Sequence, residues 1–221
     1  MNVIDAIKSR HSTRAYLDRP VARETIEQVM DTARWSPSGT NMQPWQVSIA
    51  SGDSLKRLSQ AILTARAAGQ APNPDYQYYP SEWREPYKSR RFASGMALYK
   101  ALGIDRDDKQ RRQQAWDDNY RFFGAPVGLL FFVDRALAQG SWVDMGMFIQ
   151  SVMLAAREFG LGTAPQASLA EYPGIIRAEL GVEEQFALVC GMALGYPDEN
   201  HPVNKYRTSR MEITAFCRWY D

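Results

Sequence analysis

The sequence predicts an α+β protein in which helices pack on a small central sheet of mixed or antiparallel strands. Strands are predicted at about 46–51, 126–133 and 185–194. The second and third contain the runs "APVGLLFFVD" and "QFALVCGMALGYP", which are apolar at successive positions, as in strands buried on both faces. Helical patterns lie before and between the strands, and this mixed order favours an α+β sandwich.

The first third of the chain contains three predicted helices. The run "VIDAIKSR" at 3–10 predicts a short helix with its apolar residues on one side. In the helix predicted at 23–35, apolar residues recur at i, i+3, i+4 and i+7 from Ile26, which gives one apolar face. The segment "SPSG" ends this helix, and a third is predicted at 54–68 after the first strand.

The middle of the chain changes character. Residues 71–108 are dense in Pro, Tyr and charge, so the segment is too aromatic for a solvated linker and too interrupted for a regular element. Long irregular segments inside compact domains are often lids or binding loops. The polar run at 109–124 predicts a helix.

The second half contains two more predicted helices. Residues 141–159 form a long, largely apolar helix that ends at Gly160. Because its apolar residues occupy more than one face, we expect it in the centre of the molecule or in a subunit interface. A shorter helix is predicted at 174–180, between Pro173 and Gly181.

Composition excludes several classes of protein. The 221 residues are 45% hydrophobic, which suits one globular domain or two small lobes. Lys and Arg number 26 against 25 Asp and Glu, so no global basic field would attract nucleic acid or an anionic membrane. No apolar run is long enough to span a bilayer. Cys190 and Cys217 lack metal or redox spacing and favour a reducing cytoplasm, with a single disulfide as the alternative.

Two basic clusters lie near opposite ends of the chain. In "SRHSTR", Arg10, Ser12 and Arg14 alternate, so an extended backbone would place them on one side, where they could bind a phosphate or a carbonyl that gains negative charge. The alternative is a solvated helix end. The second cluster lies in "NKYRTSR" at 204–210, and its alternative is a solvated tail. Two such clusters in a near-neutral chain make a shared anion more plausible than either does alone.

Two loops offer hydrogen-bonding groups to a ring system. In "SPSGTNMQPWQV", Ser38, Asn41 and Gln43 can both donate and accept, as a heteroaromatic ring with carbonyls and ring nitrogens requires. In "GLGTAPQAS" at 160–168, the glycines allow close backbone approach, and exposed N–H groups could meet a ring nitrogen. The alternatives are turn capping for the first loop and a helix end plus a turn for the second.

Several known sites are excluded. The chain has no G-x-G-x-x-G after a strand and no nucleotide triphosphate loop. His11 and His201 are isolated, without the spacing of a metal site or a catalytic triad, so no metal is predicted.

Four segments, "SRHSTRAY", "SPSGTNMQPWQV", "GLGTAP" and "GYPDENHPVNKYRTSR", together resemble the nitroreductase family of FMN-dependent flavoproteins. The resemblance runs from about residue 3 to 218, and only about 70–120 lacks diagnostic motifs. It implies a nitroreductase-like sandwich, with a single FMN-binding domain over 1–221 and a lid at about 72–123. It also implies an intertwined homodimer with two shared active sites.

The resemblance implies a cofactor site built from both ends of the chain. It places Arg10 and Ser12 at the FMN phosphate and ribityl end, and Arg14 near N1 and O2 of the ring, where it would favour the reduced, anionic flavin. The loop at 36–47 would reach the ring across the dimer interface, and 165–167 would face N5. The implied cofactor-binding residues are Arg10, His11, Ser12, Arg14, Pro37, Ser38, Asn41, Gln43, Pro165, Gln166, Ala167, Lys205, Arg207 and Arg210.

The implied reaction takes electrons from NADH or NADPH and passes them to a small nitroaromatic or quinone-like acceptor, with ping-pong kinetics and no catalytic side chain. Tyr79, Trp83 and Tyr87 would stack on the acceptor. The aromatic lid resembles the nitrobenzoate-reductase branch of the family. The lid cations, which are Arg84, Lys88, Arg90 and Arg91, could bind a substrate carboxylate or be solvated. Alternative functions are a reductive dehalogenase, another flavin-dependent enzyme of this fold, and a non-catalytic flavin-binding protein.

Overall fold

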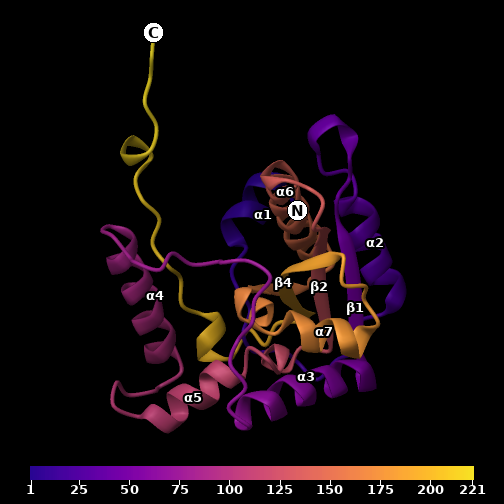
Figure 1. Ribbon diagram of the computed structural model, residues 1–221. Coiled ribbons are helices and arrows are strands. Elements are labelled where there is room, and N and C mark those ends of the chain that lie inside the picture. Colours follow the sequence, from indigo (N-terminus) through magenta and orange to yellow (C-terminus); the bar gives the residue numbers. More distant parts are fainter.

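The computed structural model describes residues 1–221 as helices around one four-stranded antiparallel sheet, which confirms the α+β prediction (Figure 1). The helices are α1 (Val3–Ser9), α2 (Arg23–Ala33), α3 (Gly52–Ala67), α4 (Tyr87–Ala101), α5 (Lys109–Asp117), α6 (Gln139–Glu158) and α7 (Pro173–Leu180). The strands are β1 (Gln46–Ser51), β2 (Val127–Asp134), β3 (Gly162–Gln166) and β4 (Phe186–Gly195), in the order β1-β2-β4-β3. No helix is long and apolar enough to cross a membrane.

The sheet separates two hydrophobic cores. In β2, alternate side chains point to opposite faces, so Leu129 and Phe131 pack with α2 and α6, whereas Leu130 and Phe132 pack with α3 and α7. The first core contains 18 buried residues and the second 15. This explains why the sequence of β2 is apolar at successive positions rather than at every second one.

α6 is the best-buried helix, and eight of its 20 residues are buried. It begins at Gln139, two residues before the predicted start, and lies between the sheet, α2 and α1. Its opposite side is not covered, since Val143 is 65% exposed. One face of the helix therefore lies in the centre of the molecule, and for the exposed face the predicted alternative, a subunit interface, stays a prediction.

Three sequence predictions are wrong in part. Residues 162–166, expected to lie in a loop after the long helix, form the edge strand β3, where Pro165 is tolerated because an edge strand needs fewer N–H donors. The segment at 71–108 was expected to lack regular elements, but it contains α4, which buries no residue and so leaves no periodic apolar signal. The helix predicted at 109–124 ends at Asp117, because Phe122 and Phe123 adopt positive φ.

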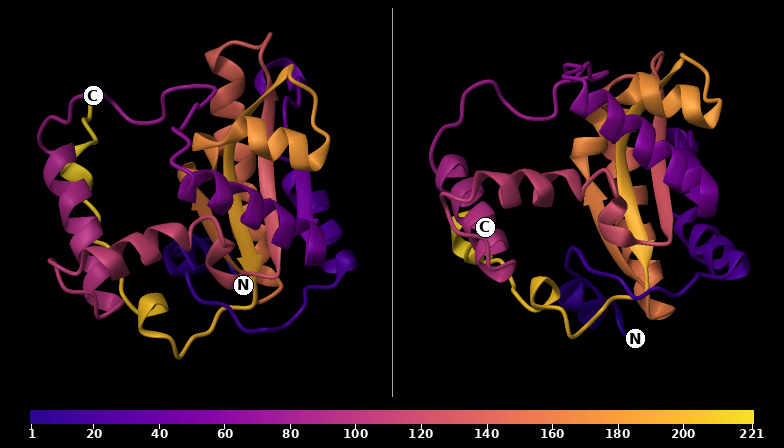
Figure 2. Two further views of the ribbon diagram at one scale, coloured as in Figure 1. Left: turned by 60° about the horizontal axis from the view of Figure 1, so that its bottom comes forward. Right: turned by 90° about the horizontal axis from the view of Figure 1, so that it is seen from below.

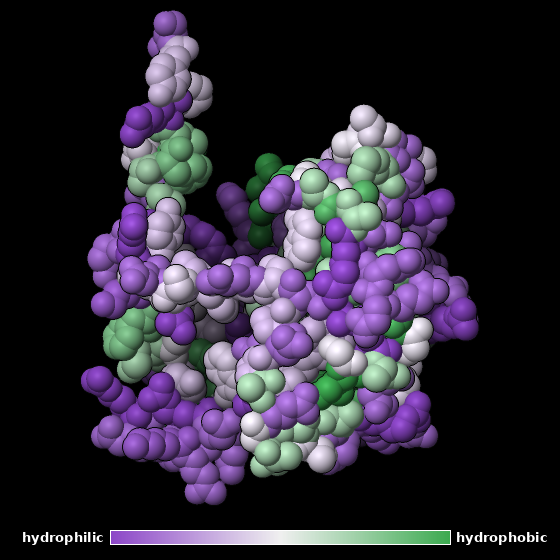
Figure 3. Space-filling model, viewed as in Figure 1, coloured by the Kyte–Doolittle hydropathy of each residue, from purple (hydrophilic) through white to green (hydrophobic).

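Residues 72–123, called the excursion below, leave the body and return to it. Figure 2 shows α4 standing away from the sheet, with the C-terminal segment beside it. No residue between 63 and 119 is buried, and none is buried after Asn204. In the space-filling view, the C-terminal segment stands clear of the body and carries apolar surface (Figure 3).

The start of the excursion is fixed by Asp75, whose side chain is only 7% exposed. Its carboxylate accepts hydrogen bonds from Arg177 of α7 at 2.7 Å, from the Leu188 N–H of β4 at 2.8 Å, and from Arg135. The next residue, Tyr76, donates its hydroxyl to the carbonyl of Val189 at 2.6 Å. Buried charge pairs of this kind are costly to break, so Asp75 ties the excursion firmly to the sheet.

The end of the excursion is fixed by Arg66 of α3. Its guanidinium pairs with Asp117 of α5 at 3.0 Å and donates to the hydroxyls of Tyr120 and Tyr172 at 3.2 and 3.3 Å. The ring of Tyr120 lies 4.4 Å from the same guanidinium. Ionic contacts therefore hold both ends of the excursion, and its end is also anchored by Tyr120 and Phe122, which are fully buried in the second core.

Candidate functional site

A cationic pocket of about 550 Å³ lies where the two ends of the chain meet. Five cations from the two ends line it: Lys8, Arg10, Arg14, Arg207 and Arg210. No carboxylate lines the pocket, and none of the five cations lies within ion-pair distance of one. Such a concentration of unpaired positive charge suits a bound anion with several oxygens, such as a phosphate.

Backbone contacts bring the first cluster onto the sheet. Thr13 donates its N–H to the carbonyl of Thr163 in β3 at 2.9 Å, and Leu17 does the same to Tyr196. The approach is close, because a Cβ on Gly162 would collide with the side chain of Thr13. Arg14 is thereby held at the edge of the sheet.

Asn204 joins the second cluster to the first. This buried amide accepts from the N–H of Arg14 at 2.8 Å and donates to the carbonyls of Ala15 and Asp198, both at 2.8 Å. One side chain thus satisfies backbone groups from both ends of the chain, which is why the residues after it lie beside Arg10.

The electrostatics of the pocket favour an anion. Burial lowers the pKa of Arg10, and the neighbouring Arg210 and Arg14 lower it further. Burial also lowers the pKa of His11; a hydrogen bond with the Ser9 carbonyl opposes this, and the nearby arginines add to it. The Nε2 atom of His11 is buried without a partner. A bound anion would relieve the repulsion among these groups.

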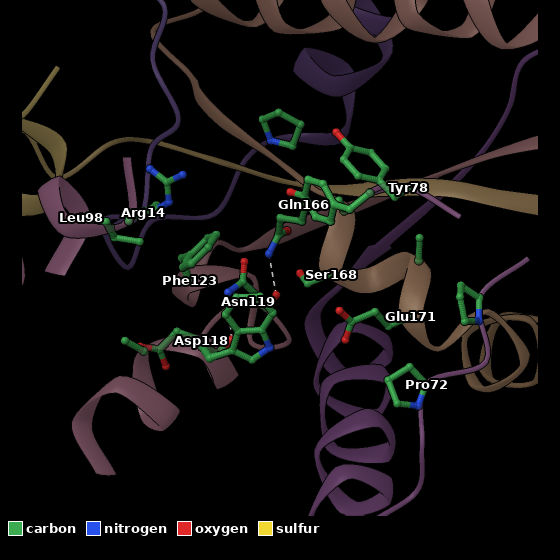
Figure 4. A pocket seen from close by; sticks show the side chains of 18 of the residues that line it. Arg14, Pro72, Tyr78, Leu98, Asp118, Asn119, Phe123, Gln166, Ser168 and Glu171 are labelled. Atoms are coloured by element: carbon green, nitrogen blue, oxygen red, sulfur yellow. Dashed lines mark hydrogen bonds between the residues drawn. The ribbon is translucent and has the colours of Figure 1, made fainter. Parts of the chain in front are cut away.

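An aromatic cavity of about 520 Å³ opens next to the cationic pocket, and Arg14 lines both (Figure 4). One wall comes from the end of β3 and the 3-10 turn η3 (Ala167–Glu171), and another from α4 and the end of α5. The excursion supplies Tyr76, Tyr78 and Tyr79. A cavity with aromatic walls and a few polar groups suits a planar ring system.

The polar groups of the aromatic cavity include two without protein partners. Gln166 is 3% exposed and donates its amide to the carbonyl of Asn119, but its Oε1 accepts no hydrogen bond. The hydroxyl of Ser168 is also buried without a partner. Buried polar atoms are normally satisfied, so these two atoms are available to a bound molecule.

The predicted acceptor-stacking residues divide. Tyr79 lines the aromatic cavity. Trp83 lies behind it, with the two ring centroids 5.5 Å apart, and does not line the cavity. Tyr87 is 61% exposed and lies elsewhere on α4. Within one chain, therefore, Tyr79 lines the aromatic cavity, whereas Trp83 and Tyr87 do not.

The polar loop after α2 has a constrained backbone. Thr40, Asn41 and Gln43 have φ of 50°, 60° and 50°, which non-glycine residues rarely adopt. Asp144 of α6 accepts from the Gly39 N–H at 3.2 Å, and the Ser38 hydroxyl accepts from the Gln43 N–H at 3.0 Å. Strained backbone that is held by specific contacts is common at functional sites.

This loop lies away from both cavities of its own chain. Pro37, Ser38, Asn41 and Gln43 line neither of them. All but one of the other predicted cofactor residues line one of the two cavities. The cationic pocket contains Arg10, His11, Ser12, Arg14, Arg207 and Arg210, and the aromatic cavity contains Pro165, Gln166 and Ala167.

Other predicted cations lie outside the two cavities. Lys205 lines a neighbouring cleft with Arg157 and Glu199. Arg90 lines an outer cleft with Arg207 and Arg210. The other lid cations, Arg84, Lys88 and Arg91, line none of these spaces. No group of three or more His, Cys, Asp or Glu residues could hold a metal.

Two residues that position Arg14 were not predicted from the sequence. The hydroxyl of Tyr206 accepts from Arg14 Nη1 at 3.0 Å, and the ring of Phe123 lies 5.9 Å from the guanidinium. Tyr206 stands inside the predicted basic cluster, so its position between Lys205 and Arg207 was a usable signal. Asn204 opens the same cluster, but nothing in the sequence pointed to its contacts or to Phe123, since these contacts depend on residues far away in the chain.

Comparison with known proteins gives a consistent result. A family model described as "Nitroreductase family" matches residues 7–196. A nitrobenzene nitroreductase from Ectopseudomonas oleovorans is 36% identical, over 96% of this chain and 94% of the relative. A 4-nitrobenzoate reductase from Pseudomonas putida is 38% identical, over 96% and 93%.

A solved structure agrees in shape as well. The FMN and NADPH-dependent nitroreductase NfnB from Sphigopyxis sp. strain HMH superposes with a TM-score of 0.97 at 39% identity, and the match covers 100% of both chains. The similarity therefore includes the excursion and also the C-terminal segment, which lies beyond the residues that the family model matches.

Proposed function

This chain belongs to the nitroreductase family, and we propose that it is an FMN-dependent oxidoreductase that uses NAD(P)H to reduce nitroaromatic compounds. The observation that carries the proposal is the junction of the cationic pocket and the aromatic cavity at Arg14. A phosphate-bearing cofactor with a flat heteroaromatic ring matches both spaces at once.

The residues present fit FMN. Unpaired cations from both ends of the chain would hold its phosphate, with the hydroxyl of Ser12 beside them. The free acceptor of Gln166 and the hydroxyl of Ser168 would meet polar atoms of the ring. When bound, FMN supplies the chemistry by accepting a hydride from NAD(P)H and passing electrons to the acceptor.

Arg14 contributes a fixed charge at the junction. Tyr206 and Asn204 hold its side chain and backbone, so little reorganisation is needed when negative charge develops nearby. Pro165, Gln166 and Ala167 form the rigid floor, because they lie at the end of a paired strand. The aromatic side chains of the excursion would exclude water and stack on the acceptor, and for this reason we propose that the excursion is a lid on a single FMN-binding domain.

We also propose that the enzyme is a homodimer with two shared sites. Support comes from apolar side chains that are exposed in one chain, on α1 and in the C-terminal segment: Val3, Ile4, Ile7, Ile213, Phe216 and Trp219. A second copy would cover them and could bring the strained loop with Asn41 and Gln43 to the ring. The thiols of Cys190 and Cys217 are unpaired, which supports a cytoplasmic enzyme.

The proposal is tested with purified protein that has been incubated with FMN and desalted. Retained flavin absorbance that NADPH or NADH bleaches without oxygen, and that nitrobenzene restores, is the expected result. Flavin that is retained but not bleached would instead indicate a binding protein without this activity. Light scattering during size-exclusion chromatography should give about twice the chain mass of 25.1 kDa, and a monomer that retains full activity would refute the shared site.

A further inference from the structure

The charges that line the aromatic cavity bear on the choice of acceptor. Of its 23 lining residues, only Arg14, Asp118 and Glu171 carry a charge at neutral pH. One cation and two carboxylates therefore face a space whose other walls are aromatic, aliphatic or neutral. The inference below rests on the proposed function, in which this cavity receives the acceptor beside the flavin.

The single cation is already engaged. Arg14 also lines the cationic pocket, and it donates to Tyr206 at 3.0 Å. In the proposed function its charge serves the flavin. It is therefore poorly available to pair with a carboxylate on the acceptor.

The two carboxylates lie on different sides of the cavity, with Asp118 after α5 and Glu171 at the end of η3, and the labelled Asn119 lies between them in Figure 4. Asp118 follows the last residue of α5 and pairs with Arg121 at 3.2 Å. Glu171 ends η3 and accepts from the hydroxyl of Tyr120 at 2.7 Å, but it has no cation within ion-pair distance. The carboxylate of Glu171 is therefore an uncompensated negative charge beside the cavity.

The basic residues that could offset this charge lie elsewhere. Arg66, which is close to Tyr120, is paired with Asp117. None of the lid cations lines the aromatic cavity, although the sequence left open that they bind a substrate carboxylate. An anionic acceptor would thus meet the unpaired carboxylate of Glu171, the carboxylate of Asp118 with its partner Arg121, and no free cation.

We propose that the aromatic cavity selects neutral nitroaromatic acceptors over nitrobenzoates. A like charge within a few ångström lowers the occupancy of an anion by roughly fivefold even in a watery environment, and by more where water is excluded. Repulsive contacts of this kind are a common source of specificity. Sequence identity does not decide the matter, because the nitrobenzene and nitrobenzoate relatives are 36% and 38% identical to this chain.

The test uses the FMN-loaded enzyme with NADPH and two probes of nearly equal shape, 4-nitrobenzamide and 4-nitrobenzoate, at low and equal ionic strength. The readout is the ratio of their kcat/KM values, neutral over anionic. We expect a ratio of at least about fivefold for the unmodified enzyme, mainly from the unpaired carboxylate of Glu171. Glu171→Gln should reduce the ratio by at least about threefold, and Asp118→Asn should reduce it by less, because Arg121 already pairs with Asp118.

Asp107→Asn is the matched control, because it removes one negative charge from an exposed residue of the excursion outside the cavity lining. It should change the ratio by less than about 1.5-fold, since exposed charges are screened by solvent and salt. A ratio near or below one for the unmodified enzyme would overturn the inference, as would a ratio unchanged in both cavity variants. If the loaded enzyme is bleached by NADPH but reduces neither probe, the proposed function itself fails.

If one cavity variant does not fold, the other still decides the question. Salt provides a second readout on the unmodified enzyme. Raising the ionic strength should lower the ratio of kcat/KM values, because it increases kcat/KM for 4-nitrobenzoate and leaves that for 4-nitrobenzamide unchanged. A ratio that is independent of salt would contradict a charge-based origin.

Discussion

α6 and α4 are helices of 20 and 15 residues that are held in place in different ways. α6 buries eight residues between the sheet and α2, whereas α4 buries none and stands on the far side of a cavity. The apolar core determines where α6 lies. The position of α4 depends on the two ends of the excursion, where Asp75 pairs with Arg177 of the body and Asp117 pairs with Arg66 of the body. The difference teaches that the body provides most of the stability and one rigid wall of the aromatic cavity. Side chains of the excursion can be substituted to suit a different acceptor at little cost in stability.

The largest expected effect contrasts one residue from each region. Phe131→Ala removes a fully buried ring from the first core and should lower the free energy of unfolding by about 3–5 kcal/mol. Leu98→Ala in α4 shortens a partly exposed side chain and should cost less than about 1 kcal/mol. Urea unfolding of both variants measures this, and similar losses would remove the distinction between the regions.

The second prediction concerns the junction between the regions. Asp75→Ala leaves the buried Arg177 without its carboxylate partner and should lower the free energy of unfolding by about 2–4 kcal/mol. It should also raise the KM for the acceptor, because Tyr76 to Tyr79 follow directly and line the aromatic cavity.

Asp31→Ala is the control for this variant, since it breaks an exposed pair with Arg34 and should cost less than about 0.5 kcal/mol. If Asp75→Ala lowered the free energy of unfolding as little as Asp31→Ala does, the ion pair between Asp75 and Arg177 would not hold the excursion in place.

The third prediction separates the roles of the two regions in catalysis. Arg14→Ala should slow flavin reduction by NAD(P)H by about tenfold and leave much of the FMN binding intact, because the lost charge lies beside the ring. Tyr79→Ala should instead raise the KM for nitrobenzene and leave the reduction rate within about twofold. Stopped-flow absorbance separates the reduction of the flavin from its reoxidation by the acceptor. If Arg14→Ala and Tyr79→Ala slowed these two steps equally, the proposed separation of roles would be contradicted.

The smallest effect is a pH dependence at the junction. Burial by itself raises the pKa of Asp75, but hydrogen bonds from Arg177, from the Leu188 N–H and from Arg135 bring it below its ordinary value. Its contribution to stability is therefore complete above the unfolded pKa, near 4, and is lost as the pH falls through the lower folded pKa. As the pH falls below about 4, Asp75→Asn should lose stability less steeply than the unmodified protein, because the substitution removes this titration. If the free energy of unfolding fell equally steeply with pH in both proteins, the pKa of Asp75 would be the same in the folded and unfolded states.

The sequence predicted the body better than the excursion, for a physical reason. β2 and β4 are continuous apolar runs and α2 has one apolar face, so burial leaves a pattern that can be read locally. α4 has no buried residue and β3 contains a glycine and a proline, so neither leaves such a pattern.

The same distinction applies to the site. Arg10, Ser12, Arg14, Arg207 and Arg210 were found from local clusters and share one pocket. The cluster member Lys205 points into another cleft, because the direction of a side chain in an irregular segment is not encoded by its spacing. Asp118 and Glu171 were not anticipated, since they reach the aromatic cavity only because hydrogen bonds from Tyr120 to Glu171 and from Gln166 to Asn119 join the segment after α5 to the region of η3.

The central claim is that cations from both ends of the chain bind one phosphate, and comparing FMN with riboflavin, which lacks the phosphate, tests it most directly. The dissociation constants of both flavins are measured for the unmodified protein, Arg10→Ala, Arg207→Ala and the double variant. Each single substitution should weaken FMN binding by about tenfold or more and change riboflavin binding by less than twofold, and the double variant should bind the two flavins about equally. Equal losses for FMN and riboflavin, or unchanged FMN affinity in either single variant, would contradict the account.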